Sequence, residues 1–286
     1  MHPTINGATY DVEVIDRSTA QDADTVAIVM PCHEAFELTR TSLEAIRRFT
    51  DIPYEVWIVD NASSRATVDR LRAETDANLL LNRTAPWKRG GLLARFTPWY
   101  RRPGGGSIAN GTALELAATV VKRRWMWVMH NDALPCKRGW LSFFLSKLSD
   151  RVRGAGAHHD PIRVHAMHQS GFLFDFSLFR SLNMNFLPHI PEYDAGDLVT
   201  IRLREAGYDV FIAENSTNRP ELRRRLAEDH WLKHIPGDIA FDDAGEIVYV
   251  HVGRGTLRYS RPQSRQARQL SLDGWVGLVR TNVLGP

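Results

Sequence analysis

Short continuous apolar runs alternate, in the first third of the chain, with segments whose apolar residues recur at helical spacing. The runs are rich in β-branched residues, which is typical of strands buried on both faces of a parallel sheet. They lie at residues 25–30, 54–59 and 78–81. Between them, the spacing of Phe36, Leu43 and Phe49 predicts a helix over 34–49, and residues 66–77 predict another. This order predicts an α/β fold with a doubly wound sheet.

Polar turn residues directly follow two of the predicted strands. Residues 31–34 follow the first strand, and residues 60–64 follow the second. In a doubly wound sheet, ligands bind where the parallel strands end at their carboxyl termini. We therefore expect both segments at the edge of the sheet that carries a binding site.

Residues 83–106 interrupt this alternation. The segment combines basic and aromatic side chains, has no acidic residue and ends in three glycines. We predict that it is a basic aromatic loop inserted into the domain. Beyond it, the pattern predicts helices over 107–123 and 197–207 and strands over 125–129, 171–176, 208–213 and 247–250.

No internal repeat and no clear linker divides the chain. We predict one domain over residues 25–256, an N-terminal extension over 1–24, and a variable C-terminal part that ends in a basic tail over 257–286. The apolar runs are too short for a membrane-spanning helix, and the first residues do not resemble a signal peptide. With only two cysteines, Cys32 and Cys136, a cytoplasmic location is expected.

Motifs between residues 25 and 256 resemble, in their order, those of family 2 glycosyltransferases. The resemblance implies a GT-A fold, which is a Rossmann-like doubly wound mixed sheet. It also implies an inverting hexosyltransferase that uses a nucleotide-diphosphate sugar, with UDP as the expected nucleotide. The motifs are Val26-Ala-Ile-Val-Met-Pro31, Trp57-Ile-Val-Asp-Asn-Ala-Ser-Ser64, Asn110-Gly111, His130-Asn-Asp-Ala-Leu-Pro135 with Gly139-Trp-Leu141, Arg202-Leu-Arg-Glu-Ala-Gly-Tyr208 and His251-Val-Gly-Arg-Gly-Thr256.

The resemblance places a divalent cation beside the donor diphosphate, where it would neutralise the departing oxygen as a Lewis acid. Asp132 is the principal predicted ligand. His130 stands where the family usually has Asp, and it either coordinates the ion or hydrogen-bonds the diphosphate. His251 is the third predicted metal or diphosphate contact. Imidazole ligands would favour Mn²⁺ over Mg²⁺.

The resemblance also implies a set of donor-binding residues at the ends of the strands. Asp60 would accept a hydrogen bond from the nucleotide base. The loop after the first strand would lie against the nucleoside, and the Gly-rich loop after the last strand would meet phosphate. The remaining predicted donor contacts are Pro31, His33, Glu34, Asn110, Asn131 and Arg254.

An inverting transferase needs a general base that removes the proton of the acceptor hydroxyl. The family has an Asp at the start of the helix that ends in Ala-Gly-Tyr. Asp197 lies within a residue of that spacing and is the first candidate. Asp194 is the second candidate, and Glu192 is the third.

The acceptor stays open at the level of sequence. A glycan or a lipid-linked saccharide, with peripheral contact to a membrane, is the first expectation. The alternative is a hydroxylated base in modified viral or cellular DNA, because cations and aromatic rings suit nucleic acid. A second alternative is a non-catalytic relative that only binds nucleotide-sugar. The arginines behind the DNA alternative include Arg101, Arg102, Arg219, Arg223, Arg224, Arg225, Arg258, Arg261, Arg265 and Arg268.

Overall fold

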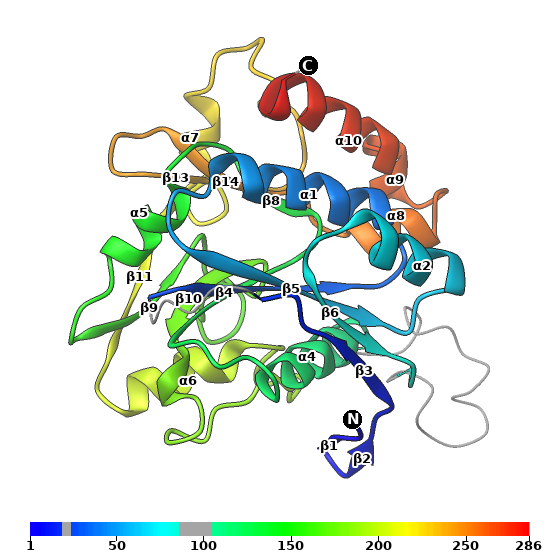
Figure 1. The fold of residues 1–286 in the computed structure, drawn as a ribbon. Coiled ribbons are helices and arrows are strands. Elements are labelled where there is room, and N and C mark those ends of the chain that lie inside the picture. Colours follow the sequence, from blue (N-terminus) through cyan, green and yellow to red (C-terminus); the bar gives the residue numbers. More distant parts are fainter. Residues whose placement is uncertain (19–23, 86–104, 286) are drawn as a thin grey trace.

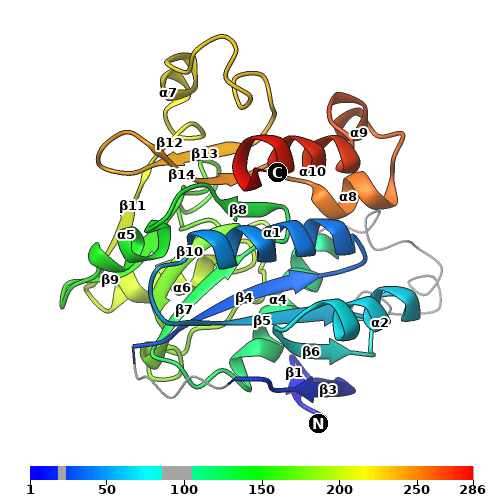
Figure 2. The ribbon, with the colours of Figure 1, turned by 45° about the horizontal axis from the view of Figure 1, so that its top comes forward.

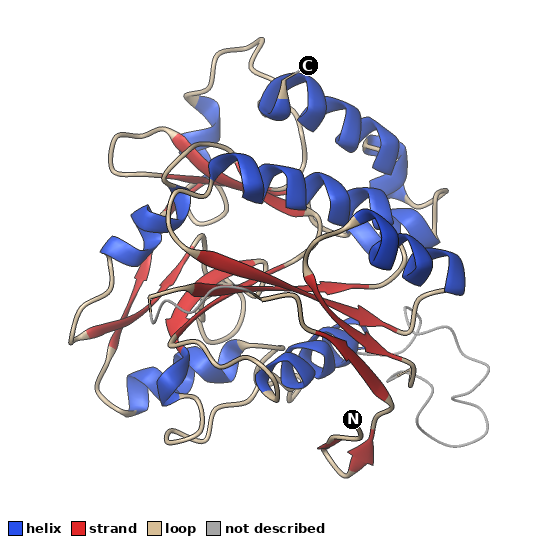
Figure 3. Cartoon of the chain, viewed as in Figure 1, coloured by secondary structure: helices blue, strands red, loops and turns tan. Residues whose placement is uncertain are grey.

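A mixed eight-stranded sheet runs through the middle of the protein, and helices cover both of its faces (Figure 1, Figure 3). The computed structural model describes residues 1–18, 24–85 and 105–285. The strand order is β11-β9-β10-β7-β4-β5-β6-β3. In chain order these strands are β3 (Val12–Ile15), β4 (Val26–Cys32), β5 (Tyr54–Asn61), β6 (Asn78–Asn82), β7 (Trp125–Met129), β9 (Val152–Gly156), β10 (Gly171–Asp175) and β11 (Asp209–Ile212).

The helices divide between the two faces of this sheet. Residues of β4 alternate between the faces: Ile28 and Met30 pack in the same core as α1, whereas Val29 packs with α4. This double burial is why the strand has no polar side and appears in the sequence as a continuous apolar run. One face carries α1 (Phe36–Phe49), α2 (Arg65–Glu74) and α5 (Trp140–Ser146), and the other carries α4 (Gly105–Ala118) and α6 (Asp197–Glu205).

The four central strands are parallel. β4 pairs in parallel with both β5 and β7, and β5 pairs in parallel with β6. β10 then adds antiparallel to both β7 and β9, which makes the sheet mixed. The predicted α/β fold class is therefore confirmed, and the strands predicted from the apolar runs all form.

A second sheet of four antiparallel strands pairs late strands of the chain with β8, which follows the carboxyl end of β7 (Figure 2). In the register between β14 and β8, His251 is the partner of Ala133. This pairing places the last residue of β14 beside the turn that contains Asp132. The strands of this sheet are β8 (Ala133–Pro135), β12 (Glu214–Asn215), β13 (Asp238–Phe241) and β14 (Ile247–His251).

Both ends of the chain differ from the sequence expectation. Within the expected N-terminal extension, a β1–β2 hairpin (Thr4–Ile5, Ala8–Thr9) precedes β3, which pairs antiparallel with β6 as an edge strand. The expected basic tail folds as helices over α1, because its apolar side chains, with Trp275 2% exposed, complete a third core cluster. These helices are α8 (Gly255–Ser260), α9 (Arg265–Gln269), α10 (Leu272–Val279) and a π-helix (Arg280–Leu284).

Two further expectations can be compared with the described residues. Most of the predicted basic aromatic loop, residues 86–104, lies outside them. The helix expected over 107–123 begins earlier and ends sooner, as α4. Short elements complete the chain, namely a 3₁₀ turn (Phe176–Leu178) and α7 (Pro220–Arg224). In the part of the chain that the structure describes, no helix has the length and apolar character required to cross a membrane.

Candidate active site

A cavity of about 630 Å³ opens at the carboxyl ends of β4, β5 and β7. This is the edge of the sheet at which ligands bind in doubly wound folds. Segments that are distant in the sequence meet there: the turn after β7, the start of α4, the loop before α6 and the loop between β14 and α8. Predicted residues that line the cavity are Pro31, His33, Asn110, His130, Asn131, Asp132, Asp194, His251 and Arg254.

The predicted metal ligands lie together at one side of this cavity. Nδ1 of His130 is 3.3 Å from Nε2 of His251, and Nε2 of His251 is 3.4 Å from Oδ1 of Asp132. Each of the three side chains offers one ligand atom, and these atoms lie within 4.8 Å of one another. Two imidazoles and one carboxylate form a donor set that could hold a divalent metal ion.

Asp132 is buried but remains a carboxylate. Burial alone would raise its pKa, but the charge of His251, a hydrogen bond from His251 and the backbone N–H of Gly255 together lower the pKa well below its usual range. Oδ2 accepts the hydrogen bond from Gly255 N over 2.7 Å. A buried carboxylate with this support is ready to bind a cation.

His130 and His251 titrate in opposite directions. Burial and the neighbouring His251 lower the pKa of His130 to about 4, so its ring is neutral at neutral pH. Although burial opposes it, the two carboxylates Asp132 and Asp238 raise the pKa of His251 to about 10. His251 therefore carries a proton between two carboxylates, and a metal ion would replace that proton.

Asp238 is a site residue that the sequence analysis missed. Its Oδ2 lies 3.0 Å from Nδ1 of His251, and it reaches the site from β13. Asp238 follows a Pro-Gly turn, with no recognisable motif around it. Only the pairing of β13 with β14, in which Asp238 is the partner of His251, shows its role.

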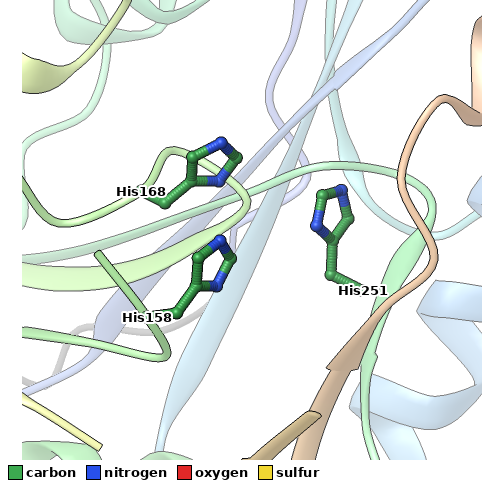
Figure 4. Close-up of side chains that lie close together, drawn as sticks. All are labelled: His158, His168 and His251. Carbon is green, nitrogen blue, oxygen red and sulfur yellow. The ribbon is translucent and has the colours of Figure 1, made fainter. Parts of the chain in front are cut away.

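Two further histidines adjoin the site and were also missed. His158 follows β9, and His168 lies in the loop before β10; their rings stack with centroids 4.5 Å apart. Figure 4 shows these two rings together, with His251 across from them. Burial lowers the pKa of His158 to about 4 and that of His168 well below its usual range. Both are neutral imidazoles at neutral pH.

Asp60, the predicted contact of the nucleotide base, does not itself line the cavity, although the following residue Asn61 and Cys32, the strand partner of Asp60, do. It is 1% exposed. Its Oδ2 accepts a hydrogen bond from Ser63 N, whereas Oδ1 is buried without a hydrogen-bond partner among the described residues. Burial raises its pKa to about 6. An unpaired buried carboxylate oxygen is costly, so this oxygen can accept a hydrogen bond from a donor that enters.

Glu34 is not among the residues that line the cavity. Its carboxylate accepts hydrogen bonds from Ser64 N at 2.6 Å and from Thr67 Oγ1 at 2.5 Å, at the first turn of α2. A carboxylate suits this position because the first backbone N–H groups of a helix lack partners. The contact of Glu34 with the nucleoside stays a prediction.

The two predicted asparagines have different neighbours. Nδ2 of Asn110 lies 3.4 Å from Nε2 of His130 and donates to Oε1 of Gln169, so Asn110 fixes the ring of His130 from the α4 side. Nδ2 of Asn131 donates to Thr39 Oγ1 over 3.2 Å, which ties the turn after β7 to α1.

The two candidate bases occupy different positions. Asp194 lines the cavity and lies 3.4 Å from Nη1 of Arg163. Asp197 is not among the residues that line the cavity. It is 2% exposed at the start of α6 and accepts a hydrogen bond from Asp194 N over 2.7 Å. Burial raises the pKa of Asp197 to about 6. The third candidate, Glu192, is exposed beside His189.

Several arginines behind the DNA alternative have structural partners. Arg258 is 4% exposed and donates to the carbonyls of Gly253 and Leu270. Arg223 donates to carbonyls of Leu232, Ile235 and Gly237, and Arg219 pairs with Glu214 and Glu221. These side chains hold loops together, so the basic surface expected from the sequence is smaller than the count of arginines suggests.

Non-glycine residues adopt left-handed backbone conformations around the cavity. They follow three different strands: Glu34 and Ala35 follow β4, Ala62 follows β5, and Arg254 follows β14, with φ values of 52°, 48°, 59° and 63°. Such conformations are unfavourable and tend to concentrate at functional sites. Their position supports the assignment of this edge as the functional one.

Comparison with known proteins gives similarity of fold. No family model and no curated protein sequence matches the chain. A mannosyltransferase from Pyrobaculum calidifontis, in complex with GDP-Man and Mn²⁺, aligns with a TM-score of 0.48 and 21% identity over 65% of this chain and 54% of that one. S. aureus TarS in complex with UDP-GlcNAc aligns with a TM-score of 0.45 and 11% identity over 66% and 55%.

A third similar structure is glucosyl-3-phosphoglycerate synthase from Mycobacterium tuberculosis in complex with Mn²⁺, UDP and glucosyl-3-phosphoglycerate. It aligns with a TM-score of 0.44 and 14% identity over 66% of this chain and 69% of that one. This chain spans only about half the length of the mannosyltransferase and of TarS.

Proposed function

We propose that the chain is a metal-dependent glycosyltransferase that moves a sugar from a nucleoside-diphosphate donor to an acceptor hydroxyl. One observation carries this proposal: Asp132, His130 and His251 converge from two separate segments in a cavity at the carboxyl ends of the parallel strands. The cavity volume of about 630 Å³ lies within the range of small-molecule and cofactor sites.

The donor set fits a divalent cation. Asp132 would hold it through its carboxylate, and His130 and His251 through imidazole nitrogens. When bound, the ion would neutralise the charge of the leaving diphosphate. The mixed nitrogen and oxygen donors support Mn²⁺ over Mg²⁺, which prefers oxygen alone.

Other side chains of the cavity are proposed to bind the phosphates and the nucleoside of the donor. Arg254 lines the cavity that also contains Asp132 and is exposed, which supports it as the proposed phosphate contact. Pro31 and His33 line the part of the cavity that we assign to the nucleoside. Asp60 is the proposed acceptor of a hydrogen bond from the nucleotide base. The donor is therefore expected to lie with its base toward β4 and β5 and its diphosphate toward β7.

Asp194 is the general base in this proposal, and Asp197 is its positioning residue. Asp194 faces the cavity, whereas Asp197 accepts the N–H of Asp194 from behind. One base on the acceptor side corresponds to a single displacement with inversion at the anomeric carbon. The acceptor is proposed to be a saccharide hydroxyl, free or lipid-linked.

The test measures nucleoside diphosphate released from a panel of UDP- and GDP-sugars, with and without Mn²⁺. We expect release that requires Mn²⁺ and that falls on the order of 100-fold or more in Asp132→Ala, since a metal contributes several kcal/mol to such a step. Asp243→Ala, at a side chain that is 73% exposed, is the matched control. Release that is equal in Asp132→Ala and in the parent chain would contradict the proposal.

A further inference from the structure

His251 presents its two ring nitrogens to different neighbours. Nε2 lies 3.4 Å from Asp132 and 3.3 Å from His130, which is the proposed donor-metal set. Nδ1 lies 3.0 Å from Oδ2 of Asp238. The same oxygen of Asp238 is 3.5 Å from Nε2 of His158. Both ring nitrogens of His251 therefore have polar neighbours. Only the neighbours of Nε2 belong to the donor-metal set.

Three imidazoles from three separate segments lie close together here. His158, His168 and His251 each offer one ring nitrogen, and these nitrogens lie within 4.8 Å of one another. In Figure 4, the rings of His158 and His168 lie together, and the ring of His251, at the end of β14, lies across from them. Nδ1 of His168 is 2.9 Å from Oγ of Ser170, which fixes the orientation of that ring.

Packing alone does not account for this cluster. His158 is 3% exposed and His251 is 7% exposed, so their polar nitrogens have left water. Burying polar groups costs free energy unless they gain partners. The partners of His158 and His251 are mainly carboxylates: Asp238 lies beside both rings, and Asp132 lies beside the other nitrogen of His251. Imidazole and carboxylate groups together are the ligands that Zn²⁺ takes in proteins.

We propose that His158, His168 and His251, with Asp238 beside them, form a second metal site that takes a borderline ion such as Zn²⁺. Three imidazoles and a neighbouring carboxylate match the ligand preference of Zn²⁺ and Co²⁺, whereas Mg²⁺ and Ca²⁺ prefer oxygen. Because His251 borders both sets, an ion at the second site sits next to the proposed donor metal. The site goes beyond the proposed transferase function and does not depend on it.

The experiment uses the full chain after removal of metal with a chelator and dialysis. Co²⁺ is the probe, because its visible absorption reports nitrogen ligands in a four-coordinate site, and Zn²⁺ is then added to displace it. We expect a Co²⁺ band that Zn²⁺ abolishes. His158→Ala and His168→Ala should remove the band, whereas Asp132→Ala should keep it. Asp238→Asn should weaken Zn²⁺ binding at least about 10-fold, because the carboxylate faces Nδ1 of His251 and Nε2 of His158, where the ion would lie.

His165→Ala is the matched control, because His165 is an exposed histidine close to His168 in the sequence. It should leave the band unchanged. Circular dichroism and thermal unfolding check that the variants fold. His168 is less buried than His158, so His168→Ala keeps the test decisive if His158→Ala does not fold.

Two results would overturn the site. One is a parent chain that binds neither Co²⁺ nor Zn²⁺ after chelation. The other is a band that survives His158→Ala and His168→Ala but disappears in Asp132→Ala, since the ion would then occupy the donor-metal set. Failure of the transferase proposal is seen separately, as no nucleotide release from any donor while the Co²⁺ band behaves as expected.

Discussion

The backbone N–H of Gly255 donates to Oδ2 of Asp132 over 2.7 Å. A Cβ atom at position 255 would lie 2.7 Å from Cβ of Asp132 and 2.7 Å from Cδ1 of Leu38. Such contacts are too short, so glycine is what allows this backbone to approach the carboxylate. Gly255, in the segment after β14, thus contacts one oxygen of Asp132, and His251, the last residue of β14, lies beside the other.

Gly255→Ala should therefore displace Asp132. We expect the free energy of unfolding to fall by about 1–3 kcal/mol, the usual cost of overpacking, and Mn²⁺ binding to weaken. Chemical denaturation and Mn²⁺ titration measure the two effects. Gly277→Ala is the control, because no heavy atom lies within 4 Å of its added Cβ and α10 should tolerate or gain from Ala. Equal Mn²⁺ affinity in both variants would count against the role of Gly255.

Glu34→Gln separates a structural role from a donor-binding one. The carboxylate supports the first turn of α2 through Ser64 and Thr67, so we expect a loss of about 1 kcal/mol of stability, typical of a helix cap. The KM for the nucleotide-sugar should not change. Thermal unfolding measures the stability, and steady-state kinetics measure the KM. A large rise in KM with unchanged stability would support the donor contact of Glu34 that the sequence predicts.

The sequence was sufficient to predict the central strands of the large sheet, because these strands are buried on both faces and therefore appear as continuous apolar runs. It failed for β9, whose Gly154 and Gly156 carry no side chain and so leave no apolar pattern. Met167 fills the space beside them. The C-terminal helices were also missed. The arginines of α8 and α9 suggest a basic tail. α10, which packs Trp275 over α1, has no basic residue but is short, so its apolar side chains give little periodic signal.

For the candidate site, the sequence was informative where a residue directly follows a predicted strand. Asp132 and His251 are both found in this way, and the structure brings them together. Asp238, His158 and His168 have no such signal, because they reach the site through the pairing of β13 with β14 and through the loops around β9 and β10. Tertiary contacts of this kind leave no local pattern in the chain.

Asp197 should make stability depend on pH in a predictable direction. Burial raises its pKa in the folded protein from 3.8 to about 6, so the folded state holds this proton more tightly than the unfolded state does. Below about pH 4 the group has no effect, because both states are protonated. As the pH rises from about 4 to about 6, ionising the buried carboxyl costs the folded protein up to about 3 kcal/mol.

Asp197→Asn removes that cost. The stability of the variant relative to the parent should therefore improve between about pH 4 and pH 7, by up to the same 3 kcal/mol. Urea unfolding at several pH values measures it, with Asp243→Asn at an exposed position as the control for a change of charge alone. A stability difference between Asp197→Asn and the parent that stays constant over this range would show that Asp197 ionises normally in the folded state.

Asp194→Asn tests the assignment of the base. The amide cannot accept the proton of the acceptor hydroxyl, so kcat for transfer should fall by about 10²–10⁴-fold. The KM for the donor should change little, because Asp194 lies on the Arg163 side of the cavity rather than at Asp132. Asp197→Asn should lower kcat less, since its side chain acts only through the N–H of Asp194. If Asp197→Asn were the more damaging of the two, the base would be Asp197, and Asp194 would be the residue that positions it.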